Sequence, residues 1–453
     1  MELLFITSLG VLLITLYIRR DWCHPIVLFF GVWTFVLFLY LLQAFRILAP
    51  TEEIIDVLAV MLVGFLLGAL CYPLVCSAKK RKIMHSRSGQ KNQSRTLTSG
   101  LHCVSSNKQI REALFFVLCA ISIVVMLVDQ MQIIQNILGG ASFSDIMRDA
   151  GGKATVEIKG TVQVVLYMFI VHPMTACVSP ICAIEVLTRE KGRIEYFIVN
   201  LLIVLLAVFH HGGRNAIIVM VISYLVAYAI LRKDCINISR KTKIIFCIGC
   251  ALAVIAVFSL SSSRGIQDIW LSFYAYFVAD IPLGQQYLAA SHILVDPTMG
   301  FFSLQGLFYP LYSVLQYFGI QPSELYDMST IMSNYIEANY LSIGDYSVTG
   351  SNAFLPAGAY PYVDGGYIFE FVFMFLYGYV SNYLYQNQRG ATGKKKALYV
   401  FWAYGLILSF CRLYFTSYSY FLGLLWILFA LYGVRNDSFS VPASEGIRRR
   451  RKS

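Results

Sequence analysis

The chain has 453 residues, of which 58% are hydrophobic and only 13% are charged, and its mean hydropathy is +0.65. Soluble domains contain about 45–50% apolar and about 25% charged residues, so this composition argues against a soluble globular domain, a disordered chain and a secreted disulfide scaffold. In a membrane protein we interpret the formal net charge of +11 as a sorting signal and not as a surface that binds nucleic acid.

Long, unbroken apolar runs indicate an all-α, polytopic transmembrane helix bundle, formed as a single integral membrane domain over residues 1–453. A helix needs about 20 apolar residues to cross a bilayer, and most of the runs reach that length. We expect about eleven spanning helices, at 3–18, 26–46, 54–76, 113–135, 161–187, 194–210, 215–231, 244–260, 366–386, 397–415 and 420–434.

The basic residues predict how these helices are oriented, because cytoplasmic loops are enriched in Lys and Arg. With the N-terminus outside and the sides alternating, 29 of the 36 Lys and Arg residues fall on the inner side. The basic loop 77–111 and the basic tail 435–453 are then cytoplasmic, and anionic lipid would hold the tail. We therefore expect a multi-pass protein of the bacterial inner membrane, with its N-terminus outside and its C-terminus in the cytoplasm.

One large outer loop, residues 261–365, differs from the other connections. It is too long to be a simple link, it contains no Lys and a single Arg, and 20 of the 99 residues from 265 to 363 are Phe, Tyr or Trp. Two apolar pieces, 270–290 and 301–320, contain Pro and Gly and are predicted to be re-entrant or interfacial helices. Because irregular backbone at membrane depth is tolerated only beside protein or a water-filled space, we expect a cavity that is open to the outside.

Arg214 is the strongest candidate for contact with a ligand. It follows the Gly212-Gly213 turn between two predicted helices, so it lies at the N-terminus of the second helix. A cation is electrostatically disfavoured at that end, whereas free amide donors, the helix dipole and a guanidinium together suit a phosphate or pyrophosphate. The alternative is an arginine that extends to the lipid headgroups.

Two further arginines, Arg264 and Arg412, lie at predicted outer helix ends and are candidates for the same ligand. A cation is favoured at a helix C-terminus, so a structural role is equally consistent with their positions. His210 and His211 could contact substrate or transfer protons, or they could pack in the core or at the interface.

Carboxylates on the outer side could accept a proton from a substrate hydroxyl, and Asp268 and Asp280 are the candidates. Asp364, directly before Gly365-Gly366, could bind substrate or could cap the next helix. The sequence contains no Asp-x-Asp and no phosphate-binding Walker motif. We therefore expect no metal, no nucleotide and no cofactor, and any bond formation outside would use an already activated substrate.

Three segments resemble the Wzy-type oligosaccharide repeat-unit polymerases, the integral membrane enzymes of O-antigen and capsule assembly. They are Gly212-Gly213-Arg214-Asn215-Ala216 at a helix start, Ser262-Ser263-Arg264-Gly265 before the large outer loop, and the stretch from Ser351 to Tyr367 that leads into a helix. The predicted helices, the basic inner side and the single large outer loop are similar to the family over nearly the whole chain.

The resemblance implies a metal-independent glycosyl transfer on the outer face of the membrane. An undecaprenyl-pyrophosphate-linked oligosaccharide would be the donor, and a sugar hydroxyl on a second lipid-linked repeat unit would attack it. Guanidinium groups aimed at the departing pyrophosphate would stabilise the transition state. The implied catalytic residues are Arg214, Arg264, Asp268 and Asp280, and the implied substrate-binding residues are Arg412, His210, His211, Asp364, Tyr360 and Tyr362.

The resemblance also implies partners, namely membrane lipid, a chain-length regulator protein and a flippase, but no nucleic acid. The main alternative is a lipid-linked oligosaccharide flippase or transporter, which would place charges deep in several helices. A second alternative is an O-antigen ligase, which differs from the polymerase only in its acceptor. A third is a nonenzymatic membrane scaffold, which the arginines at helix ends disfavour.

Overall fold

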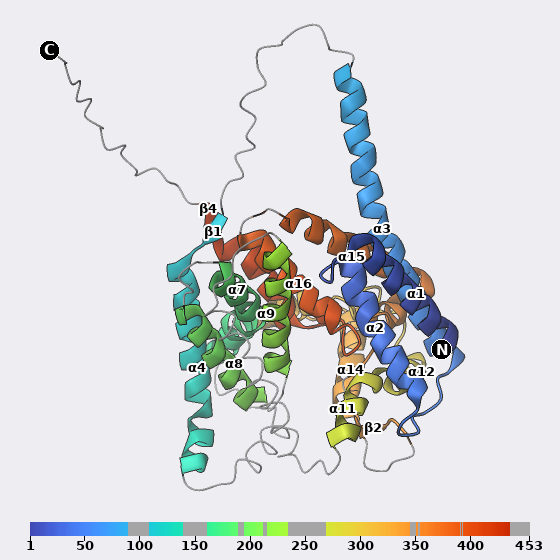
Figure 1. Ribbon diagram of the computed structural model, residues 1–453. Coiled ribbons are helices and arrows are strands. Elements are labelled where there is room, and N and C mark those ends of the chain that lie inside the picture. The colour runs from blue at the N-terminus through green and yellow to red at the C-terminus, as the bar shows by residue number, and fades with distance from the viewer. Residues whose placement is uncertain are drawn as a thin grey trace, which may run out of the picture.

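The computed structural model describes residues 1–88, 108–138, 161–188, 194–211, 215–233, 269–344, 350–351, 354–389, 391 and 393–434 (Figure 1). These residues form a bundle of helices with two short antiparallel strand pairs. Strand β1 (Lys108–Ile110) pairs with β4 (Tyr432–Val434), and β2 (Leu341–Ser342) pairs with β3 (Gly350–Ser351). The predicted all-α architecture is confirmed at this level.

Seven helical segments in the described part of the chain are long and apolar enough to cross a membrane. They lie in α1 (Glu2–Arg19), α2 (Pro25–Leu42), α3 (Glu52–Ser88), α4 (Glu112–Leu138), the run α6 (Thr161–Leu166), η1 (Tyr167–Val171) and α7 (His172–Thr188), α9 (Asn215–Lys233) and α15 (Ala359–Gln388). Two shorter apolar segments are α8 (Ile194–His211) and the run α17 (Tyr418–Leu425) with η3 (Trp426–Ala430). The predicted span 244–260 lies outside the described residues, so the total of eleven stays a prediction.

Several boundaries differ from the sequence-based expectation. Helix α3 continues to Ser88, well beyond the predicted end at 76, and α16 (Gly393–Ile407) ends before the predicted 415. The piece 270–290 forms two helices, α11 (Ile269–Val278) and α12 (Asp280–Leu294), which meet at Ala279.

The aromatic segment 269–344 forms a lobe of short helices. After α11 and α12, it contains α13 (Gln305–Tyr317) and α14 (Glu324–Ala338), and we call residues 269–344 the helical lobe. In Figure 1, α11 and β2 lie at the lower end of the molecule, whereas the free end of α3 and the β1–β4 pair lie at the upper end.

Helices α3 and α15 pack with their backbones in close approach. A Cβ atom on Gly68 would lie 1.8 Å from the carbonyl oxygen of Phe375, and one on Gly378 would lie 2.1 Å from the carbonyl oxygen of Phe65. Only glycine fits at these positions, as is common where membrane helices cross through small residues. This contact fixes the part of α15 that follows a kink at Gly365 and Gly366, whereas the predicted site residues of α15 lie before the kink.

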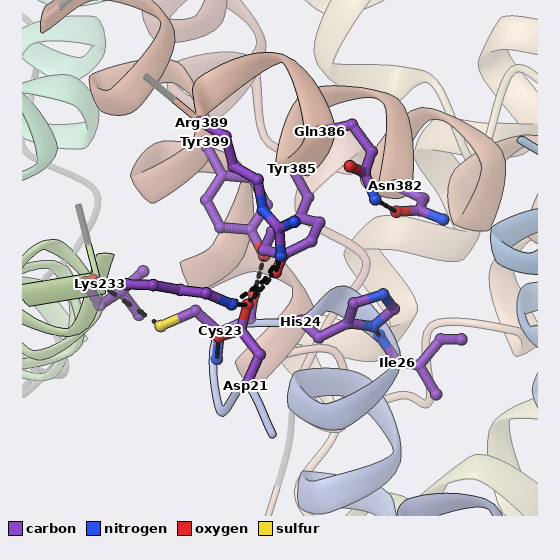
Figure 2. A network of polar contacts seen from close by, with 11 residues as sticks. Asp21, Cys23, His24, Ile26, Lys233, Asn382, Tyr385, Gln386, Arg389 and Tyr399 are labelled. Carbon is purple, nitrogen blue, oxygen red and sulfur yellow. Dashed lines mark hydrogen bonds and ion pairs between the residues drawn. The ribbon is translucent and has the colours of Figure 1, made fainter. Parts of the chain in front are cut away.

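A network around Asp21 ties three chain segments together at one end of the bundle (Figure 2). Asp21 is only 5% exposed, and its Oδ2 accepts hydrogen bonds from Lys233 at the end of α9 and from Tyr385 in α15. Arg389, just past α15, reaches the same oxygen at 3.4 Å. The α1–α2 loop and the ends of α9 and α15 therefore lie at the same end, as the alternation of basic loops predicts.

His24 lies beside this network and caps α2, since its Nδ1 accepts a hydrogen bond from the Ile26 amide at 3.3 Å. Burial, together with the positive charge of Arg19, lowers the pKa of His24 from 6.5 to about 4. The unfolded chain therefore binds a proton at a higher pH than the folded one. Stability from neutral His24 is complete above about pH 6.5 and declines, by up to about 3 kcal/mol, as the pH falls to about 4.

We expect thermal melting of the detergent-solubilised protein to show this decline between pH 6.5 and 4, and His24→Asn to reduce it. Asn keeps an acceptor at the N-cap position but does not titrate. An equal pH dependence in His24→Asn and in the original chain would contradict the assignment.

Candidate functional site

The structure describes some of the predicted site residues and not others. Arg214, Arg264 and Asp268 lie outside the described residues, and His211 is described only as the last residue of α8. The side chains of His210, Asp280, Tyr360, Tyr362, Asp364 and Arg412 are described.

Helix α8 ends at His211 and α9 begins at Asn215, so residues 212–214 connect two helices, as predicted. The Asn215 side chain accepts a hydrogen bond from Tyr414 at 3.1 Å. Tyr414 comes two residues after Arg412, whose Nη2 lies 3.3 Å from Oε1 of Glu337 in the helical lobe. Arg412 is thus held close to the helix start that directly follows Arg214.

His210, at the other side of this turn, lies next to an aspartate from a different helix. Its Nδ1 is 3.2 Å from Oδ2 of Asp129 in α4. Asp129 also accepts hydrogen bonds from Tyr167 at 3.1 Å and Gln163 at 3.2 Å, and the Tyr167 ring stacks on the His210 ring at 5.1 Å between centroids. Tyr167 belongs to η1, a π-helical turn, which is a frequent feature of functional sites.

An aromatic row joins the helical lobe to the His210 region. Tyr309 of α13 stacks on Tyr418 of α17 at 5.1 Å, and Tyr418 meets the edge of His172 at 5.5 Å. The His172 and His210 rings are 6.2 Å apart. Segments that are far apart in the sequence therefore meet around the α8–α9 connection.

Asp364 has a set of contacts that accounts for its burial. Its carboxylate accepts hydrogen bonds from the Thr298 hydroxyl and from three backbone amides, those of Gly300 at 2.9 Å, Phe302 at 3.0 Å and Ser303 at 2.8 Å. Asp364 thus caps the 298–303 turn and not its own helix. These contacts give it a structural role, and the substrate-binding prediction for it stays untested.

The two tyrosines before Asp364 also pack against protein. Tyr360 is buried and lies 4.9 Å from the Phe302 ring. Tyr362 donates a hydrogen bond to Glu53 at 2.8 Å, and Glu53 also lies 2.7 Å from Nε2 of His292. Tyr362 thus has its hydroxyl at a polar cluster, and Tyr360 lies within electrostatic range of the Arg412–Glu337 pair.

Two carboxylates are buried without a hydrogen-bond partner among the described residues, Asp280 in α12 and Glu370 in α15. Both are 0% exposed, and burial raises the pKa of Asp280 well above its ordinary value. A general base must come within hydrogen-bond reach of the proton it takes. This burial does not favour the predicted role of Asp280 as the base.

Sequence reasoning missed Asp129, which lies inside an apolar run. An ionisable residue within such a run is itself the signal that could have identified it.

In the described part of the chain, no group of three or more His, Cys, Asp or Glu side chains is placed to hold a metal ion.

No protein-family profile, curated protein or solved structure matches the chain.

Proposed function

We propose that the protein polymerises undecaprenyl-pyrophosphate-linked oligosaccharide repeat units into a surface polysaccharide, by metal-independent glycosyl transfer on the outer face of the bacterial inner membrane. One observation carries the proposal. Tyr414 contacts Asn215, and Tyr418 contacts both Tyr309 and His172. The segment 412–418 therefore contacts the helical lobe, His172 and the helix start that follows Arg214, and an anionic leaving group and sugars could be held together along it.

The leaving group in this reaction is a pyrophosphate, and charge develops on it as the glycosidic bond breaks. Arg214 directly precedes α9 in the sequence and would supply a guanidinium beside the free backbone amides of the first turn of that helix. Arg412 is paired with Glu337, but these side chains are 33% and 63% exposed. Such a solvent-exposed ion pair contributes little, so a doubly charged phosphate can displace the carboxylate from Arg412.

The sugar units require a surface that is partly apolar. Tyr309 is 39% exposed and stacks on Tyr418, and both belong to the aromatic row beside His210. A tyrosine face matches the apolar side of a pyranose, and its hydroxyl can bond to sugar hydroxyls. Arg264 and Asp268 directly precede the helical lobe in sequence, and their predicted roles remain part of this proposal.

A flippase or transporter is the second candidate, and one observation favours it. Glu370 is fully buried inside α15, and its carboxylate oxygens have no hydrogen-bond partner among the described residues. Ionisable residues at such positions are typical of ion-coupled transporters. The polymerase fits the clustered aromatic lobe better, because a transporter has no need of a large segment on one side.

Deletion of the gene separates these functions by the glycans that remain. Loss of a polymerase should leave single repeat units on the cell surface and remove the long-chain ladder seen on a gel. Loss of a flippase should leave lipid-linked units inside the cell, and loss of a ligase should leave long chains that are not transferred. Intracellular accumulation of single units would overturn the polymerase proposal. The two proposed partners should affect the same ladder. A chain-length regulator would change the length of the chains, and a flippase would change the supply of repeat units.

A further inference from the structure

We propose that His210 is the general base that takes the proton from the acceptor sugar hydroxyl, and that Asp129 is the residue that positions it. This assignment rests on the proposed glycosyl transfer and identifies its proton acceptor. The base is then a histidine of α8 and not Asp268 or Asp280, the carboxylates that the sequence suggests. The geometry that carries it is the 3.2 Å separation of His210 Nδ1 from Asp129 Oδ2.

Asp129 decides which ring nitrogen of His210 can accept a proton. A carboxylate beside Nδ1 favours the tautomer with the proton on Nδ1, so the lone pair lies on Nε2. It also stabilises the imidazolium that forms when Nε2 takes a proton. An unpaired aspartate near the end of an apolar span would be costly, and the contact with His210 offsets that cost.

Neighbouring side chains hold both members of this dyad in place. Gln163 donates to Oδ1 of Asp129, and Tyr167 donates to Oδ2. The Tyr167 ring stacks on His210 with an interplanar angle of 18°, which fixes the plane of the imidazole. The titratable groups near His210 among the described residues include Asp129 from α4, Tyr167 from η1 and His172 from α7.

In the sequence, His210 is close to Arg214, the residue proposed to contact the leaving group. His210 precedes Arg214 by four residues, and residues 212–214 form the whole connection between α8 and α9. Among the described carboxylates, Asp280 and Glu370 are 0% exposed, whereas the His210 side chain is 12% exposed. His210 is therefore better placed than either carboxylate to meet a substrate hydroxyl.

The chemical step balances with these groups alone. The bond between the anomeric carbon of the donor sugar and the pyrophosphate oxygen breaks, and its electron pair leaves with the lipid pyrophosphate. The acceptor hydroxyl oxygen forms the new bond to that carbon, and its proton moves to Nε2 of His210. The imidazolium then releases the proton to the departing pyrophosphate or to water, which restores the neutral base.

The test uses purified full-length protein and, as substrate, lipid-linked single repeat units extracted from the host strain that lacks this chain. We expect Asp129→Asn to reduce the rate of polymer formation by about 10²–10⁴-fold, the usual contribution of general-base catalysis. Loss of the carboxylate also destabilises the imidazolium, so the rising limb of the pH–rate profile should move to lower pH. A merely structural role for Asp129 would lower the rate without moving that limb.

Three controls keep the result interpretable. Asp296→Asn changes an exposed aspartate in the helical lobe and should alter neither the rate nor the profile. His172→Gln removes a second imidazole near His210 and should move the limb less than Asp129→Asn does, because the two rings are 6.2 Å apart between centroids whereas Asp129 lies 3.2 Å from Nδ1. His210→Ala should lose activity and regain part of it when imidazole is added, and its melting temperature reports whether the variant folds.

The outcomes separate this inference from the proposed function. If the original protein forms no polymer from the extracted units, the glycosyl-transfer proposal fails. If it forms polymer, but Asp129→Asn keeps its pH profile and loses less than about threefold in rate, only the dyad assignment is overturned. The dyad assignment is also overturned if a folded His210→Ala variant regains no activity with imidazole and Asp129→Asn leaves the pH profile unchanged.

Discussion

Replacement of Arg214 by Ala should abolish long-chain polysaccharide and leave single repeat units on the cell surface. The guanidinium would be aimed at charge that develops on the leaving pyrophosphate, so its loss raises the barrier and does not merely weaken binding. Removal of one such preorganised donor typically costs about 10²–10³-fold in rate. The measurement is the distribution of glycan chain lengths on a gel, with the variant's abundance in the membrane checked in parallel.

Replacement of Arg214 by Lys tests the geometry of the contact. Lys keeps the charge but cannot form two parallel hydrogen bonds to a phosphate, so we expect an incomplete and shortened ladder. Arg46→Ala removes an arginine that is exposed in the structure; it is the control and should leave the ladder unchanged. Chains of normal length from Arg214→Lys would exclude a bidentate role for Arg214.

The sequence was most informative where an apolar run alone determines the structure. The starts and ends of α1, α8 and α9 fall within about two residues of the predicted ones, because a helix is the only open-chain way to satisfy backbone hydrogen bonds in lipid. The extension of α3 to Ser88 was missed, because the polar composition of that stretch was interpreted as a linker. Lys and Arg are nevertheless good helix formers that can prolong an existing helix.

Helix α14 was missed for a different reason. Its buried positions, Tyr326, Ser329, Met332 and Ile336, recur with helical spacing, and the Ser323 hydroxyl accepts a hydrogen bond from the Tyr326 amide as an N-cap. These are recognisable signals of a helix on the surface of a protein. Hydropathy alone does not show them, because α14 is largely polar and has only 15 residues, fewer than a membrane span needs.

The contacts of the candidate site depend on pairings between distant elements. Asn215 and Tyr414 are separated by 199 residues, and Asp129 and His210 come from different helices. Hydropathy gives the order of helices along the chain but not which of them are neighbours, so neither contact follows from it. Composition did identify the aromatic excess from which the Tyr309–Tyr418 pair comes.

Replacement of Asp364 by Ala should destabilise the protein severely. It would leave the buried Thr298 hydroxyl and the amides of Gly300, Phe302 and Ser303 without the acceptor that they share. Each buried polar group that loses its partner costs about 1–3 kcal/mol, so the total should be at least about 4 kcal/mol. That is a large fraction of the roughly 5–15 kcal/mol that stabilises a typical fold.

The melting temperature and the yield of folded protein in detergent measure this effect, and both should fall. Asp327→Ala removes an exposed acid at the first turn of α14, in the helical lobe that also contains the 298–303 turn, and should cost less than about 1 kcal/mol. The alternative, that Asp364 binds substrate, predicts a different result, namely a variant that melts normally but forms no polymer. Because the carboxylate already accepts four hydrogen bonds from the protein, little of its acceptor capacity remains for a substrate. We therefore expect the loss of polymer in Asp364→Ala to follow the loss of folded protein.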